Sequence, residues 1–149
     1  MLDEYEINSS TLAIIPVDDC NSKVMEEECE YLVKQSAAEI IDNSCKFFGS
    51  SFKGRSEGTK SLIGGNYKLP IVIEESRDII FFPTASPKLN ECYWISLNNL
   101  VDYQKDNKCS LVRFKNGTIL NIDISIFSLE NQVLRASRLE NVLRKRKFN

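Results

Sequence analysis

The spacing of apolar residues changes between strand-like and helix-like several times along this chain. Over residues 5–17 and 29–35, apolar and polar residues alternate loosely and β-branched residues are frequent. This pattern predicts two strands. The first should end at Pro16, because proline cannot donate a hydrogen bond to a neighbouring strand.

Helical spacing begins after the second of these strands. Ser36 and Glu39 form an S-x-x-E capping box, and apolar residues then recur every three or four positions. Gly49 stands where a glycine commonly ends a helix. The sequence therefore predicts a helix that starts after Ser36 and ends at Gly49.

A second and weaker helix is predicted immediately afterwards. Ser50 or Ser51 can cap its start, and the pair Gly64-Gly65 can end it. Its interior contains Gly54 and Gly58, each of which costs about 1 kcal/mol in helix propensity. These two glycines therefore require a reason other than helix formation.

The pattern after Pro70 is that of strands until Ser125, where helical spacing returns. The expected strands are 71–75, 78–83, 92–97, 109–114 and 118–124. The first two form a hairpin, and Asn116-Gly117 predicts a type I′ turn between the last two. Residues 126–143 carry an apolar helical stripe, and basic residues fill the last turns of that helix.

This order of elements is strands, two helices, antiparallel strands and a final helix, which is typical of an α+β domain. We expect an antiparallel β-sheet or a partly closed barrel, with two central helices and a C-terminal helix. No repeat, linker or low-complexity segment interrupts the chain. Residues 1–149 are therefore expected to form a single domain.

Composition removes several classes of chemistry. The chain has 149 residues, of which 42% are hydrophobic, and it contains no histidine. Without histidine, Ser-His-Asp and Cys-His catalysis and His-ligated zinc are excluded. The five cysteines include no C-x-x-C pair, which favours isolated thiols in a reducing cytosol over a zinc site. No apolar run is long enough for a membrane span, and no signal peptide is predicted.

The net charge of −2 conceals a strongly polarised chain. Residues 1–43 have a net charge of −9 and residues 44–70 a net charge of +4. Residues 71–134 have a net charge of −2, and residues 135–149 have a net charge of +5. The basic segments suggest an anionic partner, unless acidic and basic segments pair with each other on folding.

The stretch GSSFKGRSEGTK, residues 49–60, differs by one residue type from a phosphate-binding P-loop. Arg55 stands where the P-loop has its lysine, and a predicted helix precedes the stretch where a P-loop requires a strand. Nucleotide binding is therefore disfavoured. The cations here interleave with Phe47, Phe48 and Phe52, which fits either a nucleic-acid contact surface or a phenylalanine core with solubilising charges.

Several longer blocks resemble a known family. DNSCKFFGSSFKGRSEGTKSLIGGNYKLPI, IIFFPTASPKLNECYWIS and FKNGTILNIDISIFSLENQVLRASRL occur in this order. Together they resemble the competence transcription factor (ComK) family of Gram-positive bacteria over roughly residues 5–139. No single block is specific, whereas the set is.

The resemblance implies a cytoplasmic transcriptional activator of DNA-uptake genes, with no cofactor and no catalysis. Members bind paired A/T-rich boxes through the minor groove, as dimers that assemble further on double-stranded DNA. They are controlled by an adaptor that delivers them to a AAA+ protease. The adaptor recognises a tail that would follow residue 149, so this control is expected only of a chain that carries the tail.

Charge and glycine placement, rather than the resemblance, select the candidate DNA contacts. They are Lys46, Lys53, Arg55, Lys60, Lys68, Arg135, Arg138, Arg144, Lys145, Arg146 and Lys147. Trp94 lies in a strand pattern and is expected in the core. The ENQVLR block, residues 130–135, is expected to form either a dimer face or a helix packing surface, with Val133 and Leu134 assigned to packing.

A second function from another class is also compatible with the sequence. The chain could be a protein-interaction module that pairs with or titrates a full-length activator, and the acidic residues 1–43 favour this interpretation. A continuous positive surface over residues 46–60 would support DNA binding. Neutralisation of that surface by the N-terminal acids would support the interaction module.

Overall fold

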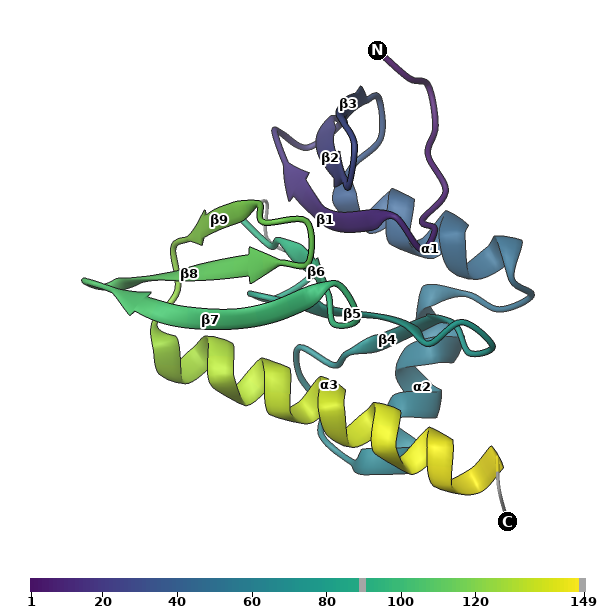
Figure 1. Cartoon of the computed structure of the whole chain (residues 1–149). Coiled ribbons are helices and arrows are strands. Elements are labelled where there is room, and N and C mark those ends of the chain that lie inside the picture. Colours follow the sequence, from purple (N-terminus) through teal and green to yellow (C-terminus); the bar gives the residue numbers. More distant parts are fainter. Residues whose placement is uncertain (89–90, 148–149) are drawn as a thin grey trace.

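The computed structural model describes residues 1–88 and 91–147, and Figure 1 shows its elements. The first half contains β1 (Thr11–Pro16), β2 (Ser22–Glu26), β3 (Glu30–Val33), α1 (Ala37–Phe47) and α2 (Phe52–Ile63). The second half contains β4 (Ile71–Glu74), β5 (Ile79–Pro83), β6 (Trp94–Ser96), β7 (Leu100–Asp106), β8 (Cys109–Phe114), β9 (Ile119–Ile122) and α3 (Ile126–Lys147).

The strands form two open antiparallel sheets. Six strands form one sheet in the order β3-β2-β1-β6-β5-β4, and β7-β8-β9 form the other. The pairing of β1 with β6, through Ala13–Ile95 and Ile14–Trp94, joins the N-terminal strands to the second half of the chain. The predicted α+β class, with antiparallel strands, two central helices and a C-terminal helix, is confirmed, and both sheets are open.

Each face of the six-stranded sheet has its own hydrophobic core, and β5 contributes to both. Ile79 and Phe81 face a cluster that includes Ile40, Ile41 and Cys45 of α1. The alternate residues of β5, Ile80 and Phe82, face a second cluster formed with β8, β9 and α3. Because successive side chains of a strand point to opposite faces, the run IIFFP can be buried throughout.

The ends of α1 follow the expected capping chemistry. The Ser36 side chain accepts a hydrogen bond from the Glu39 N–H at 3.1 Å, and the Glu39 carboxylate accepts one from the Ser36 N–H at 3.5 Å. At the other end Gly49 has φ = +86°, and the Ser50 N–H donates to the Cys45 carbonyl at 3.0 Å. This hydrogen-bond pattern at the end of a helix needs a residue with positive φ, which explains the glycine.

The start of α2 also explains one of its two glycines. Ser51, rather than Ser50, caps the helix by accepting a hydrogen bond from the Gly54 N–H at 2.9 Å. A Cβ at position 54 would lie 2.8 Å from the Ser50 hydroxyl and 3.2 Å from that of the capping Ser51, so a side chain there would force the serine hydroxyls to move. A Cβ at Gly58 would meet nothing within 4 Å, so packing does not account for that glycine.

Three details differ from the sequence-based expectations. The strands β2 and β7 were not predicted, because both carry several charged residues and β7 is mostly exposed. The first strand begins at Thr11 rather than at residue 5. The strands β2 and β7 are defined by hydrogen bonding to their neighbours β1 and β8, and not by a hydrophobic pattern.

The turn between β8 and β9 is a hairpin, as expected, but it is not of type I′. That type requires positive φ at both central residues, whereas only Gly117 has it, at +90°. Hydrogen bonds between Phe114 and Thr118 and from Gly117 to Phe114 close a three-residue loop instead. Within this loop, the Asn116 side-chain amide donates a hydrogen bond to the Glu27 carbonyl at 2.9 Å.

Candidate nucleic-acid interface

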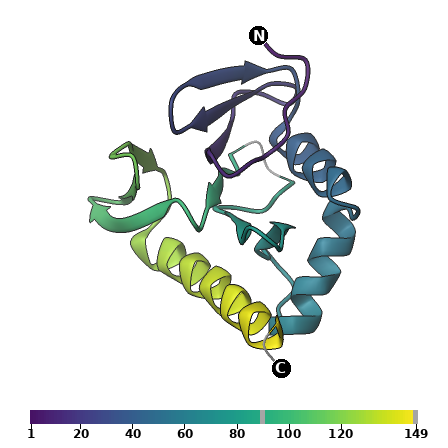
Figure 2. The ribbon, with the colours of Figure 1, turned by 45° about the vertical axis from the view of Figure 1, so that its right-hand side comes forward.

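Tertiary structure brings the two basic segments of the chain together. Helices α2 and α3 contact each other, and Figures 1 and 2 show α3 running past α2 toward the C-terminus. Leu143, near the end of α3, lines a hollow of about 220 Å³ together with Gly54 and Gly58 of α2. The basic residues of α2 and of α3 therefore lie on helices that contact each other, and both Arg55 and the acid Glu75 line the hollow between them.

The exposed cations of α2 lie on one side of this helix. Lys53 and Lys60 are seven residues apart, about two helical turns, and both are exposed. Gly54 and Gly58 are four residues apart and border the hollow beside α3. Helix α2 thus presents lysines on one side and a surface with little side-chain bulk on the other.

Several candidate cations already have partners within the molecule. The Lys46 ammonium lies 3.0 Å from the Asp42 carboxylate. Arg144 lies 3.5 Å from Asp78 and 3.7 Å from Glu140, and the Lys147 ammonium donates to the Glu75 carbonyl at 3.1 Å. The Lys46 and Arg144 side chains are more than half exposed, so their ion pairs are weak and these cations remain available to a polyanion.

Arg55 occupies an unusual position among the candidates. It is half-buried beside Gly54 in the hollow, and its Nε has no hydrogen-bond partner although that atom is buried. A buried N–H without a partner costs about 1–3 kcal/mol. Arg55 is therefore less accessible than Lys53 or Lys60.

Arg135 and Gln132 hold the loop that connects α2 to β4. The Arg135 guanidinium donates to the Tyr67 carbonyl at 2.9 Å and to the Lys68 carbonyl at 3.2 Å, and burial lowers the pKa of this guanidinium. The buried Gln132 amide donates to the carbonyls of Lys68 at 2.8 Å and Pro83 at 2.7 Å. The ENQVLR block therefore fixes the 64–70 loop against α3.

The remaining residues of this block behave differently from one another. Val133 packs against the core of the second sheet, as expected. Leu134 is 57% exposed, so its assignment to packing is wrong, because it lies on the side of α3 that faces away from the core. Arg138 is exposed one turn beyond Arg135. Trp94 is 1% exposed, which confirms its core position.

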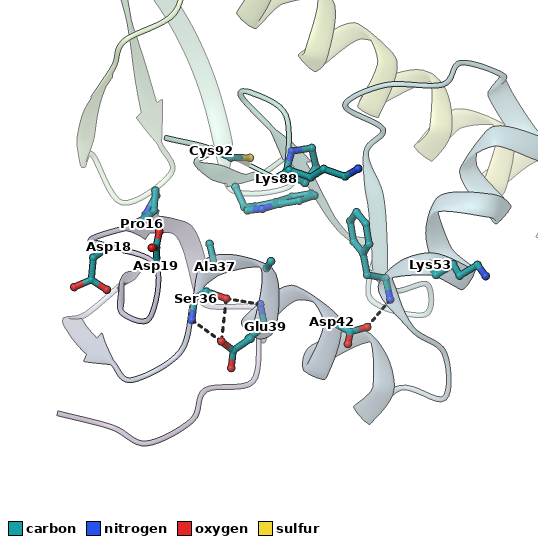
Figure 3. Close-up of a pocket in the computed structure, with 14 residues that line it drawn as sticks. Pro16, Asp18, Asp19, Ser36, Ala37, Glu39, Asp42, Lys53, Lys88 and Cys92 are labelled. Atoms are coloured by element: carbon teal, nitrogen blue, oxygen red, sulfur yellow. Dashed lines mark hydrogen bonds between the residues drawn. The ribbon is translucent and has the colours of Figure 1, made fainter. Parts of the chain in front are cut away.

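A second and larger hollow, an open apolar pocket of about 720 Å³, includes Phe52 and Lys53 at the start of α2 (Figure 3). Phe52 and Trp94 line it and meet edge to face, with ring centroids 6.1 Å apart. Figure 3 shows Asp18 and Asp19 at one end and Lys53 at the other. Its lining carboxylates are Asp18, Asp19, Glu39 and Asp42.

Each of three rim carboxylates is held by local hydrogen bonds. Asp42 accepts from the Phe52 N–H at 2.9 Å, and this bond lowers the pKa of its carboxyl group. The pKa of Asp18 is lowered by hydrogen bonds from the side chain of Asn21 and the N–H of Cys20. Glu39 completes the cap of α1. Four carboxylates against the two lysines of the lining, Lys53 and Lys88, give the pocket an excess of negative charge, which disfavours phosphate there and favours the α2–α3 region as the candidate for DNA.

Within the described residues, the N-terminal acids meet the basic segment at two places: Asp42 pairs with Lys46, and Lys53 lines the pocket that has carboxylates on its rim. The ion pair between Asp42 and Lys46 joins residues 1–43 to residues 44–70. Lys23–Glu30 and Lys34–Asp3 are pairs inside the acidic segment itself. In residues 1–88 and 91–147, we find no group of three or more side chains that could hold a metal ion.

Comparison with known proteins identifies the family. The chain matches the family described as ComK protein over residues 2–147. The chain belongs to the ComK protein family. It is also 36% identical over 142 residues to a protein of Bacillus subtilis (strain 168) named "Competence transcription factor". This alignment covers 93% of the chain and 74% of the relative.

The search of solved structures and the lengths of the helices complete these findings. No solved structure matches this chain significantly, so the fold rests on the structure described above. No helix within the described residues is long and apolar enough to cross a membrane. The family membership confirms the resemblance that the sequence blocks predicted.

Proposed function

We propose that this chain is a DNA-binding transcriptional activator of competence genes and not an enzyme. Family membership, with a relative named as a competence transcription factor, carries this proposal. As for the family, the expected targets are paired A/T-rich boxes read through the minor groove by dimers or higher assemblies. The expected compartment is the cytoplasm, and a protease adaptor is an expected partner of a chain that carries the family tail.

The α2–α3 surface supports this function on physical grounds. Lys53, Lys60 and Arg138 are exposed cations on two adjacent helices. Lys145 and Arg146 add charge at the end of α3. Lysine and arginine neutralise phosphates and release counterions, and the narrow minor groove of A-tracts concentrates negative potential that attracts them. Lys46, Arg55, Lys68, Arg135, Arg144 and Lys147 complete the proposed set, with Arg135 acting through the loop that it holds.

Duplex binding at two salt concentrations tests the proposal. Fluorescence anisotropy should show tighter binding to a duplex with two A/T tracts in helical phase than to a G/C-rich duplex of equal length. Raising the salt should weaken both, because counterion release drives the phosphate contacts. Netropsin, which occupies the A/T minor groove, should compete. Equal affinity for both duplexes, or no effect of netropsin, would contradict minor-groove recognition.

The apolar pocket with carboxylates on its rim supports the second function, a protein-interaction module. Its apolar lining, with Phe52 and Trp94, and its rim of carboxylates suit a protein segment better than DNA. If the chain binds no duplex but forms a stable complex with a full-length family member in size-exclusion chromatography, this second function replaces the first. Charge reversal at Asp18 and Glu39 should then weaken that complex.

A further inference from the structure

The loop between α2 and β4 displays an aromatic ring to solvent. Tyr67 is 81% exposed, an exposed fraction matched among the described aromatic residues by Phe127. Its side chain belongs to neither hydrophobic cluster of the fold. The ring therefore contributes nothing to core packing, and an exposed aromatic residue of this kind is available for a partner.

The backbone under this ring is held rigidly. Gly64, Gly65 and Lys68 all have positive φ, at +77°, +94° and +51°. A Cβ at Gly65 would lie 3.0 Å from the Arg135 guanidinium, so the loop packs closely against α3. Positive φ is ordinary for the two glycines, whereas for Lys68 it is a conformation that persists only where the surroundings enforce it, and such residues cluster at functional sites.

Hydrogen bonds from α3 supply that enforcement. Arg135 donates to the carbonyls of Tyr67 and Lys68, and Gln132 donates to the Lys68 carbonyl from a buried position. A loop that is ordered before binding loses little conformational entropy when it binds. Tyr67 is thus presented as a preformed projection and not as part of a loose loop.

The surroundings of Tyr67 are basic. Lys68 is the next residue, and Lys60 is an exposed lysine in the last turn of α2, whose carbonyl accepts a hydrogen bond from the Gly64 N–H at 2.9 Å just before the loop. Arg138 is exposed one turn beyond Arg135 on α3. One acid, Glu57, is also exposed on α2, one turn before Lys60. An exposed aromatic ring among cations suits a nucleic acid, whose backbone is anionic and whose bases stack.

We propose that Tyr67 is a wedge that inserts against a base step in the minor groove of an A/T-rich duplex. Lys60, Lys68 and Arg138 would hold the flanking phosphates, and Gln132 and Arg135 would be positioning residues for the loop. Apolar wedges in the minor groove partly unstack a step and kink the duplex, and flexible TA steps accept such kinks most easily. This inference rests on the proposed DNA-binding function and adds the residue that deforms the DNA.

Four proteins test the wedge: the parent chain, Tyr67→Ala, Tyr67→Phe and Phe127→Ala. The last is a matched control, because Phe127 is equally exposed and lies on α3 away from the loop. Each is titrated into an A/T-tract duplex, with affinity from anisotropy and bending from energy transfer between end labels. A 2-aminopurine placed at successive steps reports unstacking. Circular dichroism confirms that each variant is folded.

The wedge predicts a specific pattern. Tyr67→Ala should lose about 10-fold or more in affinity, the usual range for removing one base-contacting ring, and should bend the duplex less. Its salt slope should stay at the parent value, because tyrosine carries no charge. Tyr67→Phe and Phe127→Ala should resemble the parent, and the 2-aminopurine signal should rise with the parent and not with Tyr67→Ala.

The positioning role has its own readout. Arg135→Leu should weaken DNA binding and reduce bending of the duplex. The double variant with Tyr67→Ala should bind about as weakly as Tyr67→Ala alone, because both substitutions remove the same contact of Tyr67 with DNA. Full additivity would mean that Arg135 contacts DNA independently, which would overturn its positioning role.

Failure of the wedge and failure of DNA binding are distinguishable. If the parent binds and bends A/T duplexes and Tyr67→Ala does so equally well, the wedge is overturned and the proposed function stands. If Tyr67→Ala binds DNA normally but self-associates less in analytical ultracentrifugation, Tyr67 is a protein contact and the wedge is overturned. If the parent binds no duplex, the proposed function fails and the wedge with it.

Discussion

Two residues of α3 show how a motif that is ambiguous in sequence acquires a definite role in structure. Gln132 is only 3% exposed, yet its amide has two carbonyl partners in different elements, Lys68 and Pro83. Buried amides are stable only when their hydrogen bonds are made. Gln132 therefore ties α3 both to the 64–70 loop and to the end of β5.

Replacing this amide should destabilise the fold. Gln132→Met keeps most of the side-chain volume but leaves the Pro83 carbonyl without its donor, which should cost about 1–3 kcal/mol of unfolding free energy. Urea unfolding should show a lower midpoint with an unchanged slope. The exposed neighbour Asn131 supplies a control, because Asn131→Ala should change the midpoint little. Equal midpoints for Gln132→Met and the parent would contradict the assigned role.

The lysines of α2 should act on DNA through charge alone. Lys53→Ala and Lys60→Ala should each weaken binding to A/T-rich and G/C-rich duplexes by similar factors. Each should also reduce the salt slope by about one, because one phosphate contact is lost. Lys105→Ala, on the exposed strand β7, serves as the control. A salt slope unchanged in both α2 variants would move the DNA contact away from this helix.

At the scale of elements, α2 is a helix held in place by its surroundings more than by its own composition. It has a single buried residue, Thr59, whose hydroxyl donates to the Pro70 carbonyl at 2.7 Å. Its packing against α1, α3 and β4 compensates for two interior glycines. A helix with so little core of its own is free to display a functional surface.

The last turn of α3 should add DNA affinity without sequence preference. Ending the chain at Leu143 removes Arg144, Lys145, Arg146 and Lys147, so affinity for A/T and G/C duplexes should fall alike at low salt. The salt slope should shrink by up to about three or four. The loss of the contacts to Asp78 and Glu75 should cost at most about 1 kcal/mol of stability. A lower melting temperature with unchanged DNA affinity and salt slope would assign these cations to helix stability alone.

At the scale of the whole molecule, the acidic and basic segments form different elements but meet at the start of α2, where Asp42 pairs with Lys46 and Lys53 lines the pocket of carboxylates. The acidic residues 1–43 form β1, β2, β3 and the start of α1, while the basic segments meet at α2 and α3. The hydrophobic core beneath α1 contains two thiols, Cys45 and Cys92, which are 0% and 2% exposed. Burial raises the pKa of each thiol to about 11.

These thiols should make the fold sensitive to alkaline pH. Because the folded pKa values lie above the unfolded value near 8.5, stability is fully present below about pH 8.5 and is lost as pH rises toward 11. Each thiol should contribute a loss of about 1–2 kcal/mol by pH 10. The raised pKa of Tyr5, caused by burial and then by its hydrogen bond to Glu26, acts in the same direction above about pH 10.

Urea midpoints between pH 7.5 and 10 measure this effect. Cys45→Ala and Cys92→Ala should flatten the decline, whereas the exposed Cys20→Ala should leave it unchanged. In the native state a thiol reagent should modify Cys20 and Cys29 quickly and reach Cys45 and Cys92 only on unfolding. A decline that is the same in all three variants would assign it to other groups.

Local signals in the sequence determined the helices, their caps and most strands. The S-x-x-E box placed the start of α1, Gly49 and Gly64 placed two helix ends, and the burial of Trp94 followed from its strand. These features depend on residues within a few positions of one another, which is why they can be predicted. The family, too, was recognisable from ordered blocks of residues.

Only the tertiary structure decided the features that depend on distant partners. The strands β2 and β7 exist through pairing with β1 and β8, and their polar sequences gave no periodic signal. The meeting of α2 with the end of α3, and the hold of Gln132 and Arg135 on the loop of Tyr67, join segments more than sixty residues apart. Such contacts are set by how the elements pack on both faces of one sheet, and no local pattern of residues encodes that arrangement.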